Sequence, residues 1–173
     1  MIFVHLTTED QDKGVAAGIK QYNESRQSNR KDNHGFENRH GSGLNVSILG
    51  MQGEIATARA LNVPWEERIC SFKRADLCEY IQVRTTKYPD GHLLFRTHGE
   101  SPDPLGHDYY LVVLRGEWAK VVGHLRIDAD TLASFPRDWF RDPTRTGKRP
   151  PAWCIPQSAL GPVERNILFT SMN

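Results

Sequence analysis

The hydrophobic pattern of this chain changes once, after Pro64 and Trp65, and this change constrains the fold more than any other feature. Before it, apolar residues recur every three or four positions, as on one face of a helix. After it, they alternate with polar residues, as in strands. The pattern predicts two helices, then several strands, then small helices. At 173 residues, the chain suits a single domain of the α/β (α+β) class.

The first expected helix begins near the N-terminus. Thr7 or Thr8 offers its N-cap, and Glu9 and Asp10 follow in the first turn, where carboxylates favour the positive end of a helix. The helical composition continues to about Gln27. Three apolar residues at helical spacing are expected to form its buried stripe: Val15, Ile19 and Tyr22.

The second expected helix begins at Ser47 and runs to about Leu61. Its apolar face is formed by residues at helical spacing: Ile48, Ile55, Ala58 and Leu61. Glu54 lies mid-helix beside Gly53. Because glycine in an exposed helix costs about 1 kcal/mol against alanine, Gly53 indicates a close approach to another backbone or a ligand here. Taken alone, Glu54 is also consistent with a solvated side chain.

Five later segments have the pattern of strands: Arg68–Lys73, Tyr80–Lys87, His92–His98, Tyr109–Leu114 and Trp118–Ile127. The turn sequence Tyr-Pro-Asp-Gly at 88–91 predicts a hairpin between the second and third of them. The fourth is nearly all apolar, as expected of a central strand covered on both faces. Asp130 then caps a short helix through Ala133.

Composition excludes several classes of protein. Hydrophobic residues make up 38% of the chain and charged residues 25%, which is typical of a globular protein. The chain has no apolar run long enough to cross a bilayer and no signal-peptide layout, which predicts a cytoplasmic protein without a membrane partner. The three cysteines have no CxxC spacing, so no zinc site is indicated. The net charge is only +1, so a nucleic-acid surface requires uneven placement of basic residues.

Glu54, Asp76 and the triplet Gln82-Val83-Arg84 form the most informative constellation. Asp76 precedes an expected strand, and Gln82 and Arg84 share one face of it because strand side chains alternate. We expect a metal ion to contact the Asp76 carboxylate, the Gln82 amide oxygen and the Val83 carbonyl, with Glu54 approaching from the helix behind. Arg84 then stabilises charge on a phosphate or orients the attacking water.

These residues resemble the motif of the PD-(D/E)XK nuclease superfamily. By this resemblance Asp76 matches the metal-binding acid, Gln82 the second acidic position, Arg84 the lysine position and Glu54 the helical acid. The likeness covers roughly residues 45–130 and implies a restriction-endonuclease-like core, a central mixed sheet flanked by helices. It also implies Mg²⁺ as the cofactor, with Mn²⁺ as a substitute. Glutamine for an acid and arginine for lysine depart from the pattern.

The resemblance implies a Mg²⁺-dependent endonuclease that hydrolyses the backbone of duplex or branched DNA in a phage, restriction or repair system. A homodimer is expected, because cutting two strands needs two sites. The departures leave open a catalytically degenerate nucleic-acid-binding or assembly protein, and RNA is an alternative substrate. On this interpretation residues 1–44 form a strand, a helix and a mobile polar loop, and residues 45–173 form the nuclease-like core.

The same four side chains also have a purely structural interpretation. Asp76 would cap a turn, and Gln82 and Arg84 would be the outward face of an amphipathic strand. For any one residue this interpretation is the better one, whereas all four at these spacings favour the nuclease-like site.

A basic segment near the C-terminus is the second candidate for contact with nucleic acid. Its five basic residues are Arg137, Arg141, Arg145, Lys148 and Arg149. They bracket Trp139, Phe140 and Trp153, so charge and aromatic faces alternate, as on surfaces that contact a nucleic-acid backbone. A solvated loop whose aromatic side chains pack onto the core fits the sequence equally well.

Overall fold

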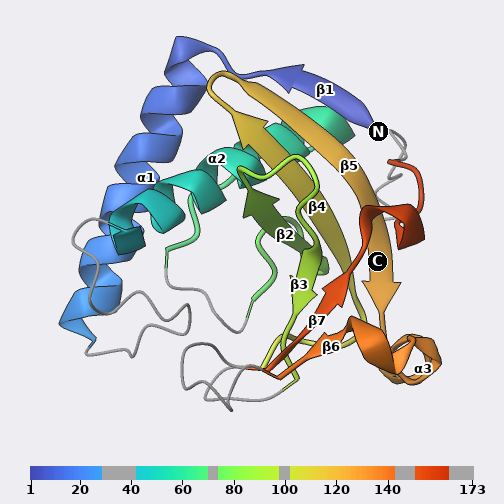
Figure 1. Ribbon diagram of the computed structural model, residues 1–173. Coiled ribbons are helices and arrows are strands. Elements are labelled where there is room, and N and C mark those ends of the chain that lie inside the picture. Colours follow the sequence, from blue (N-terminus) through green and yellow to red (C-terminus); the bar gives the residue numbers. More distant parts are fainter. Residues whose placement is uncertain (29–41, 70–73, 98–101, 143–150, 164–173) are drawn as a thin grey trace, which may run out of the picture.

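The computed structural model describes residues 1–28, 42–69, 74–97, 102–142 and 151–163 (Figure 1). Its helices are α1 (Thr8–Gln27), α2 (Ser42–Leu61) and α3 (Ala129–Ser134), with short 3₁₀ turns at Arg137–Trp139 and Gln157–Ala159. Its strands are β1 (Ile2–His5), β2 (Ile81–Thr86), β3 (Leu93–Phe95), β4 (His107–Arg115), β5 (Trp118–Ile127), β6 (Phe140–Arg141) and β7 (Ala152–Ile155).

Four strands form the main sheet in the order β1-β5-β4-β2. β2 runs parallel to β4, whereas β5 pairs antiparallel with both β4 and β1, so the sheet is mixed. A smaller antiparallel sheet has the order β3-β7-β6. In Figure 1 the two long helices lie to one side of the main sheet. The predicted single α+β domain with a mixed sheet and flanking helices is therefore confirmed.

β4 is the central strand that the sequence predicts. Tyr110, Val112 and Leu114 point into a core formed with α2, β1 and β5. Tyr109, Leu111 and Val113 point the other way, into a core formed with β3 and β7. The apolar run is thus buried on both faces because each face is covered by a different layer.

α1 begins as predicted, but it buries a different face. Thr7 is the N-cap, and its side chain and that of Asp10 form a reciprocal capping box. The predicted stripe is wrong, since Val15 and Ile19 are 37% and 41% exposed. α1 instead packs on α2 through small residues: a Cβ on Gly18 would lie 2.5 Å from the Ile48 Cα. Such close packing of two helices selects for small side chains rather than for large apolar ones.

Gly53 in α2 makes the close approach that its position in the sequence indicates. α2 begins at Ser42, five residues before the predicted cap, and ends at Leu61 as predicted. A Cβ on Gly53 would lie 1.8 Å from Thr85 Oγ1 and 2.8 Å from Thr85 Cβ, so only glycine lets the helix cross β2 this closely. This contact sets Glu54 beside the end of the main sheet. No helix within the described residues has both the length and the hydropathy of a membrane span.

Three local predictions need correction. The turn at 88–91 forms, with the Gly91 N–H donating to the Tyr88 carbonyl at 3.0 Å, but β2 and β3 join different sheets instead of forming a hairpin. Arg68 and Ile69 are not in a strand, and the rest of the expected 68–73 strand lies outside the described residues. The cap of α3 is Asp128, not Asp130, because the Asp128 carboxylate reaches the Thr131 N–H at 2.8 Å.

Candidate active site at the open edge of β2

β2 is an edge strand, and its open side positions Asp76. Ile81 exchanges both backbone hydrogen bonds with Leu77, at 3.1 and 3.2 Å, so its polar groups face away from β4. Alternate residues of a strand face the same way, which directs the N–H and carbonyl of Val83 outward as well. Asp76 Oδ2 accepts the Val83 N–H at 2.7 Å. The turn before β2 thus folds Asp76 back along the strand.

Glu54 approaches this edge from α2 and is buried, with 8% of the residue exposed. Burial raises the pKa of the Glu54 carboxyl well above its ordinary value, and the nearby Asp76 raises it further. The Trp65 indole acts in the opposite direction, yet neither Glu54 Oε2 nor Trp65 Nε1 has a hydrogen-bond partner of good geometry among the described residues. Glu54 is therefore a buried acid with an unsatisfied oxygen, which is costly unless it serves a purpose.

Asp76 shares this environment. Burial raises the pKa of the Asp76 carboxyl, although Arg84 and the Val83 N–H both act to lower it. Its side chain is still 24% exposed, so the carboxylate pair is reached from solvent on the Asp76 side. Asp76 raises the pKa of Glu54, and Asp103 raises that of Asp76, so the acids here form a site that a cation would stabilise.

The Arg84 guanidinium lies directly beside Asp76. Its Nη1 donates to the Val83 carbonyl at 3.0 Å and lies 3.7 Å from Asp76 Oδ2. Its Nη2 donates to Asp103 Oδ1 at 2.8 Å. Burial by itself would lower the pKa of Arg84, but Asp103 and Asp76 outweigh that effect and raise it. Arg84 is thus a permanent positive charge fixed at the edge of the carboxylate pair.

Gln82 is buried on the same face of β2 as Arg84, and its Nε2 donates a long hydrogen bond of 3.4 Å to the Arg74 carbonyl. The metal-ligand set expected from the sequence is therefore only partly assembled. Asp76 lies close enough to Glu54 to raise its pKa, whereas the Val83 carbonyl accepts from Arg84. Gln82 contacts the Arg74 carbonyl through its amide nitrogen, so the predicted role of its amide oxygen stays a prediction.

The donor set nonetheless fits a magnesium ion. Among the described residues, three or more Asp, Glu, His or Cys side chains are nowhere grouped to hold a metal. Mg²⁺, however, is usually held by only one or two carboxylates and fills its other positions with water and substrate phosphate. Glu54, whose Oε2 lacks a partner in the described part of the chain, and Asp76 offer such a pair.

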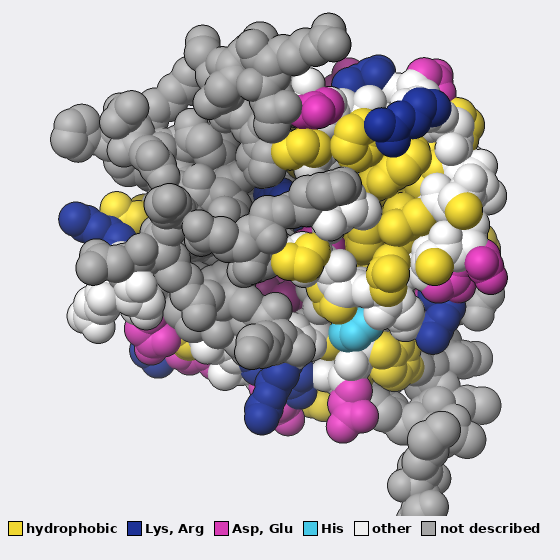
Figure 2. Space-filling model, turned by 90° about the horizontal axis from the view of Figure 1, so that it is seen from below, with side chains coloured by type: hydrophobic (Ala, Val, Ile, Leu, Met, Phe, Trp, Pro, Cys, Tyr) yellow, Lys and Arg dark blue, Asp and Glu magenta, His cyan; other side chains and the backbone are white. Residues whose placement is uncertain are grey.

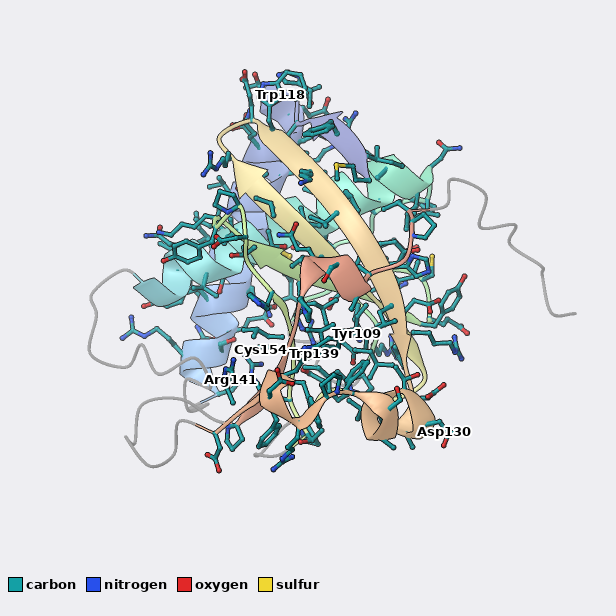
Figure 3. The ribbon with its side chains drawn as sticks, turned by 45° about the vertical axis from the view of Figure 1, so that its right-hand side comes forward. Tyr109, Trp118, Asp130, Trp139, Arg141 and Cys154 are labelled. Atoms are coloured by element: carbon teal, nitrogen blue, oxygen red, sulfur yellow. The ribbon has the colours of Figure 1, made fainter. Side chains whose placement is uncertain are left out.

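The described basic residues of the C-terminal segment, Arg137 and Arg141, contact other groups of the protein. Arg137 stacks on the Phe140 ring, with Cζ 4.2 Å from the ring centroid, and Arg141 donates to the Asp138 carbonyl. Trp139, Phe140 and Trp153 pack onto the second core, as the alternative interpretation expects. Figure 3 shows Trp139 and Arg141 at the opposite end of the molecule from Trp118. Arg145, Lys148 and Arg149 lie outside the described residues.

The described part of the surface at that end carries both acidic and basic side chains (Figure 2). Seen from below, Figure 2 shows a patch of hydrophobic side chains with acidic and basic side chains scattered around it. The prediction that the five basic residues contact nucleic acid therefore stays a prediction.

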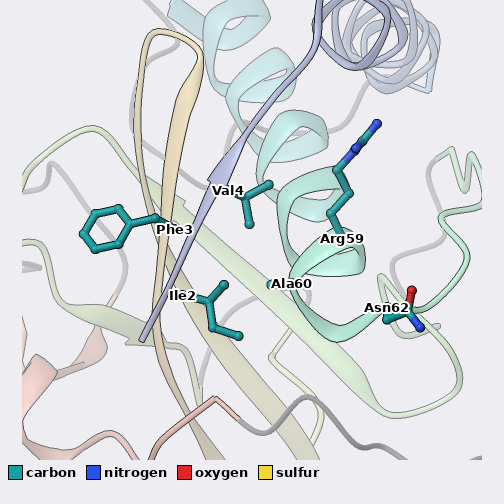
Figure 4. Close-up of a pocket in the computed structure, with 6 residues that line it drawn as sticks. All are labelled: Ile2, Phe3, Val4, Arg59, Ala60 and Asn62. Atoms are coloured by element: carbon teal, nitrogen blue, oxygen red, sulfur yellow. The ribbon is translucent and has the colours of Figure 1, made fainter.

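A shallow pocket elsewhere on the molecule lacks the chemistry of the β2 edge. It has a volume of about 370 Å³ and lies between β1 and the end of α2 (Figure 4), lined by Ile2, Phe3, Val4, Arg59, Ala60 and Asn62. Its one charged side chain, Arg59, is already paired with Asp10 at 2.7 Å. We place the candidate site at the β2 edge because ionisable groups converge there.

Several residues near this edge could not be found from the sequence. Asp103 lies in an irregular segment 19 positions beyond Arg84, with no motif to mark it. His107 is partly buried, with its buried Nδ1 unpartnered among the described residues, and it acts to lower the pKa of Asp76. It shares a face of β4 with Tyr109, whose ring lies under the Arg84 guanidinium at 5.3 Å. Only the topology brings these side chains together.

The chain was compared with protein-family models, with curated proteins and with solved structures, and none of the three comparisons found a match. The likeness to the PD-(D/E)XK superfamily therefore rests on the residues of the β2 edge alone.

Proposed function

We propose that the protein is a Mg²⁺-dependent phosphodiesterase that hydrolyses the DNA backbone at the open edge of β2. The observation that carries this proposal is the pair formed by Glu54 and Asp76. Both carboxyls have raised pKa values, Glu54 Oε2 has no partner within the described part of the chain, and a fixed guanidinium lies beside Asp76. A fold that needed only stability would gain nothing from a buried acid whose pKa is raised further by a second acid beside it.

Each residue of the site has a role in this proposal. Glu54 and Asp76 would hold the cation, which supplies charge neutralisation at the phosphate and a more acidic bound water. Arg84, beside Asp76, stabilises negative charge on the non-bridging phosphate oxygens. Gln82 supports the strand from its buried side through the Arg74 carbonyl. The choice of DNA over RNA and the homodimer follow from the superfamily resemblance.

A second candidate function has its own supporting observation. The Arg84 guanidinium occupies the place beside Asp76 and the Val83 carbonyl where the sequence predicts a metal. A protein that had lost cleavage could keep this internal cation and bind nucleic acid without Mg²⁺. Such a degenerate protein would hold DNA equally well with and without a chelator.

The two functions separate in one experiment. The parental protein and Asp76→Asn are incubated with duplex DNA, branched DNA and RNA across a Mg²⁺ and Mn²⁺ titration, with EDTA as the blank. Asparagine retains an oxygen for the Val83 N–H, so the fold is preserved while the negative charge is lost. Asp12→Asn makes the same change at an exposed position of α1 and is the matched control.

We expect metal-dependent cleavage of DNA by the parental protein and by Asp12→Asn, and none by Asp76→Asn. Cleavage by Asp76→Asn at the parental rate would show that the site is assigned wrongly. Binding without cleavage by any variant, unaffected by EDTA, would favour the degenerate protein instead.

A further inference from the structure

The Arg84 guanidinium is held at both of its terminal nitrogens. Nη2 donates to Asp103 Oδ1 at 2.8 Å, whereas Nη1 faces the Val83 carbonyl and Asp76. The ring of Tyr109 lies beneath the guanidinium plane at 5.3 Å and supports it from the interior. These contacts fix the side chain in one orientation, since a planar fork bound at two points cannot rotate freely.

Asp103 is itself anchored. Its Oδ2 accepts the Arg96 N–H at 2.7 Å, and its own N–H donates to the Arg96 carbonyl at 2.9 Å. The Tyr109 hydroxyl donates to the Pro104 carbonyl at 2.6 Å, which ties the same segment to β4. Only 9% of the Asp103 side chain is exposed. Asp103 is therefore a rigid anchor that joins the end of β3 to the side chain of Arg84 on β2.

We propose that Asp103 is a positioning residue. Its hydrogen bond to Arg84 Nη2 orients the guanidinium so that Nη1 faces a phosphate bound beside Glu54 and Asp76. This inference rests on the proposed function and names a residue that the motif does not contain. Asp103 acts through Arg84 and does not touch the substrate. One oxygen of its carboxylate accepts from the guanidinium and the other accepts from the backbone, so both oxygens take part in orienting Arg84.

The geometry also explains why Arg84 can still bind a phosphate oxygen while it is paired with the negative charge of Asp103. A guanidinium has five N–H donors, and Asp103 engages it from the side away from Asp76. The Nη1 group beside Asp76 can exchange the Val83 carbonyl for a phosphate oxygen without breaking the bond to Asp103. Precise orientation of such a group matters, because a misplacement of about 1 Å can lower a rate by roughly 100-fold.

The test is Asp103→Asn, measured first without any substrate. Asparagine keeps an oxygen for the Arg96 N–H but loses the charge that holds the guanidinium. In nuclear magnetic resonance spectra of the parental protein, we expect separate Arg84 Nη signals, because rotation of the group is slow. In Asp103→Asn these signals should merge, while the Arg96 backbone amide keeps its position. Assignment of the signals comes from their loss in Arg84→Met.

The second readout is steady-state cleavage of DNA in Mg²⁺. We expect Asp103→Asn to lower kcat roughly tenfold or more with little change in KM, because a loosened Arg84 stabilises the transition state less well. Asp108→Asn is the matched control: Asp108 also pairs with an arginine on a neighbouring strand, Arg126, at 3.8 Å, but on the other face of β4. It should leave the Arg84 signals and kcat unchanged.

Two outcomes would overturn the inference while the proposed function survives. One is that the Arg84 signals stay separate in Asp103→Asn. The other is that they merge and kcat is unchanged. If the parental protein shows no metal-dependent cleavage, the proposed function fails and the positioning role fails with it. That outcome is distinguishable, because it appears in the parental protein before any variant is made.

Discussion

Asp10 and Glu54 are both helical carboxylates that the fold buries, one at the start of α1 and one in the middle of α2. The cost of burying the Asp10 carboxylate is offset by hydrogen bonds and an ion pair. It accepts from the Thr7 N–H and hydroxyl, each at 2.9 Å, and from Arg59 Nη2 at 2.7 Å. Burial alone would raise the pKa of Asp10, but these partners lower it.

For Glu54 the effect of burial on the pKa is larger than the effect of its partners. Its Oε2 is unpaired among the described residues, the charged group that shifts its pKa most is a second acid, Asp76, and its pKa is raised. The comparison teaches that burial by itself does not mark a functional acid. What distinguishes Glu54 is that its burial is not fully offset by hydrogen bonds or by a counter-charge, so its pKa stays raised.

The largest expected difference between Glu54 and Asp10 is in Mg²⁺-dependent cleavage. Glu54→Gln should lower Mg²⁺-dependent cleavage at least about 100-fold, a loss of about 2.7 kcal/mol in transition-state stabilisation, because one of two cation ligands loses its charge. Asp10→Asn should leave kcat unchanged. Equal losses in both variants, measured on folded protein, would mean that Glu54 contributes only to stability.

The second prediction tests whether the close packing of Gly53 on Thr85 brings Glu54 to the β2 edge. Gly53→Ala should destabilise the protein by about 1–3 kcal/mol, because the added Cβ collides with Thr85 and pushes α2 away from β2. Gly50→Ala is the control in the same helix, since a Cβ there meets nothing within 4 Å. It should be neutral or stabilising by up to about 1 kcal/mol. Denaturant unfolding of both variants measures the difference.

The pH dependence of stability should differ in sign between the two acids. The pKa of Glu54 is raised in the folded state, so its contribution is favourable below the ordinary value of 4.5 and is lost as the pH rises towards the folded value. Parental protein should therefore lose stability relative to Glu54→Gln as the pH rises, by at most about 1.4 kcal/mol per pH unit. A gap that is constant from pH 4 to pH 8 would contradict this.

The smallest effect concerns Asp10. Its pKa is lowered, so its stabilisation is present above the ordinary value of 3.8 and is lost as the pH falls through the folded value. Asp10→Asn should cost about 1 kcal/mol near neutral pH, since asparagine keeps a capping oxygen and Arg59 is half exposed. The control Glu9→Gln, at an exposed acid in the same turn, should change stability by less than about 0.5 kcal/mol. Thermal unfolding of the two variants checks this.

Local signals in the sequence predicted much of the fold. The cap at Thr7, the end of α2 at Leu61 and the buried run of β4 follow from capping chemistry and hydrophobic period. The buried face of α1 could not be predicted, because it depends on how closely α2 approaches. Likewise, the 88–91 turn does not reveal that its two flanking strands enter different sheets.

The candidate site was predicted in part for the same reason. Glu54, Asp76 and Arg84 are marked by their spacing and by Gly53, and the structure brings these three together. Asp103 and Tyr109 reach Arg84 only because of the sheet topology, so no local pattern indicates them.

The central claim is that Glu54 and Asp76 form an incompletely compensated acidic pair that binds a divalent cation. Its most direct test is a Mn²⁺ titration of the protein alone near pH 7.5, with free Mn²⁺ followed by electron paramagnetic resonance. The account predicts a single bound ion per chain that Mg²⁺ displaces, with binding lost in both Glu54→Gln and Asp76→Asn and retained in Asp10→Asn. Binding of the same strength in all four proteins, or in none, would contradict it.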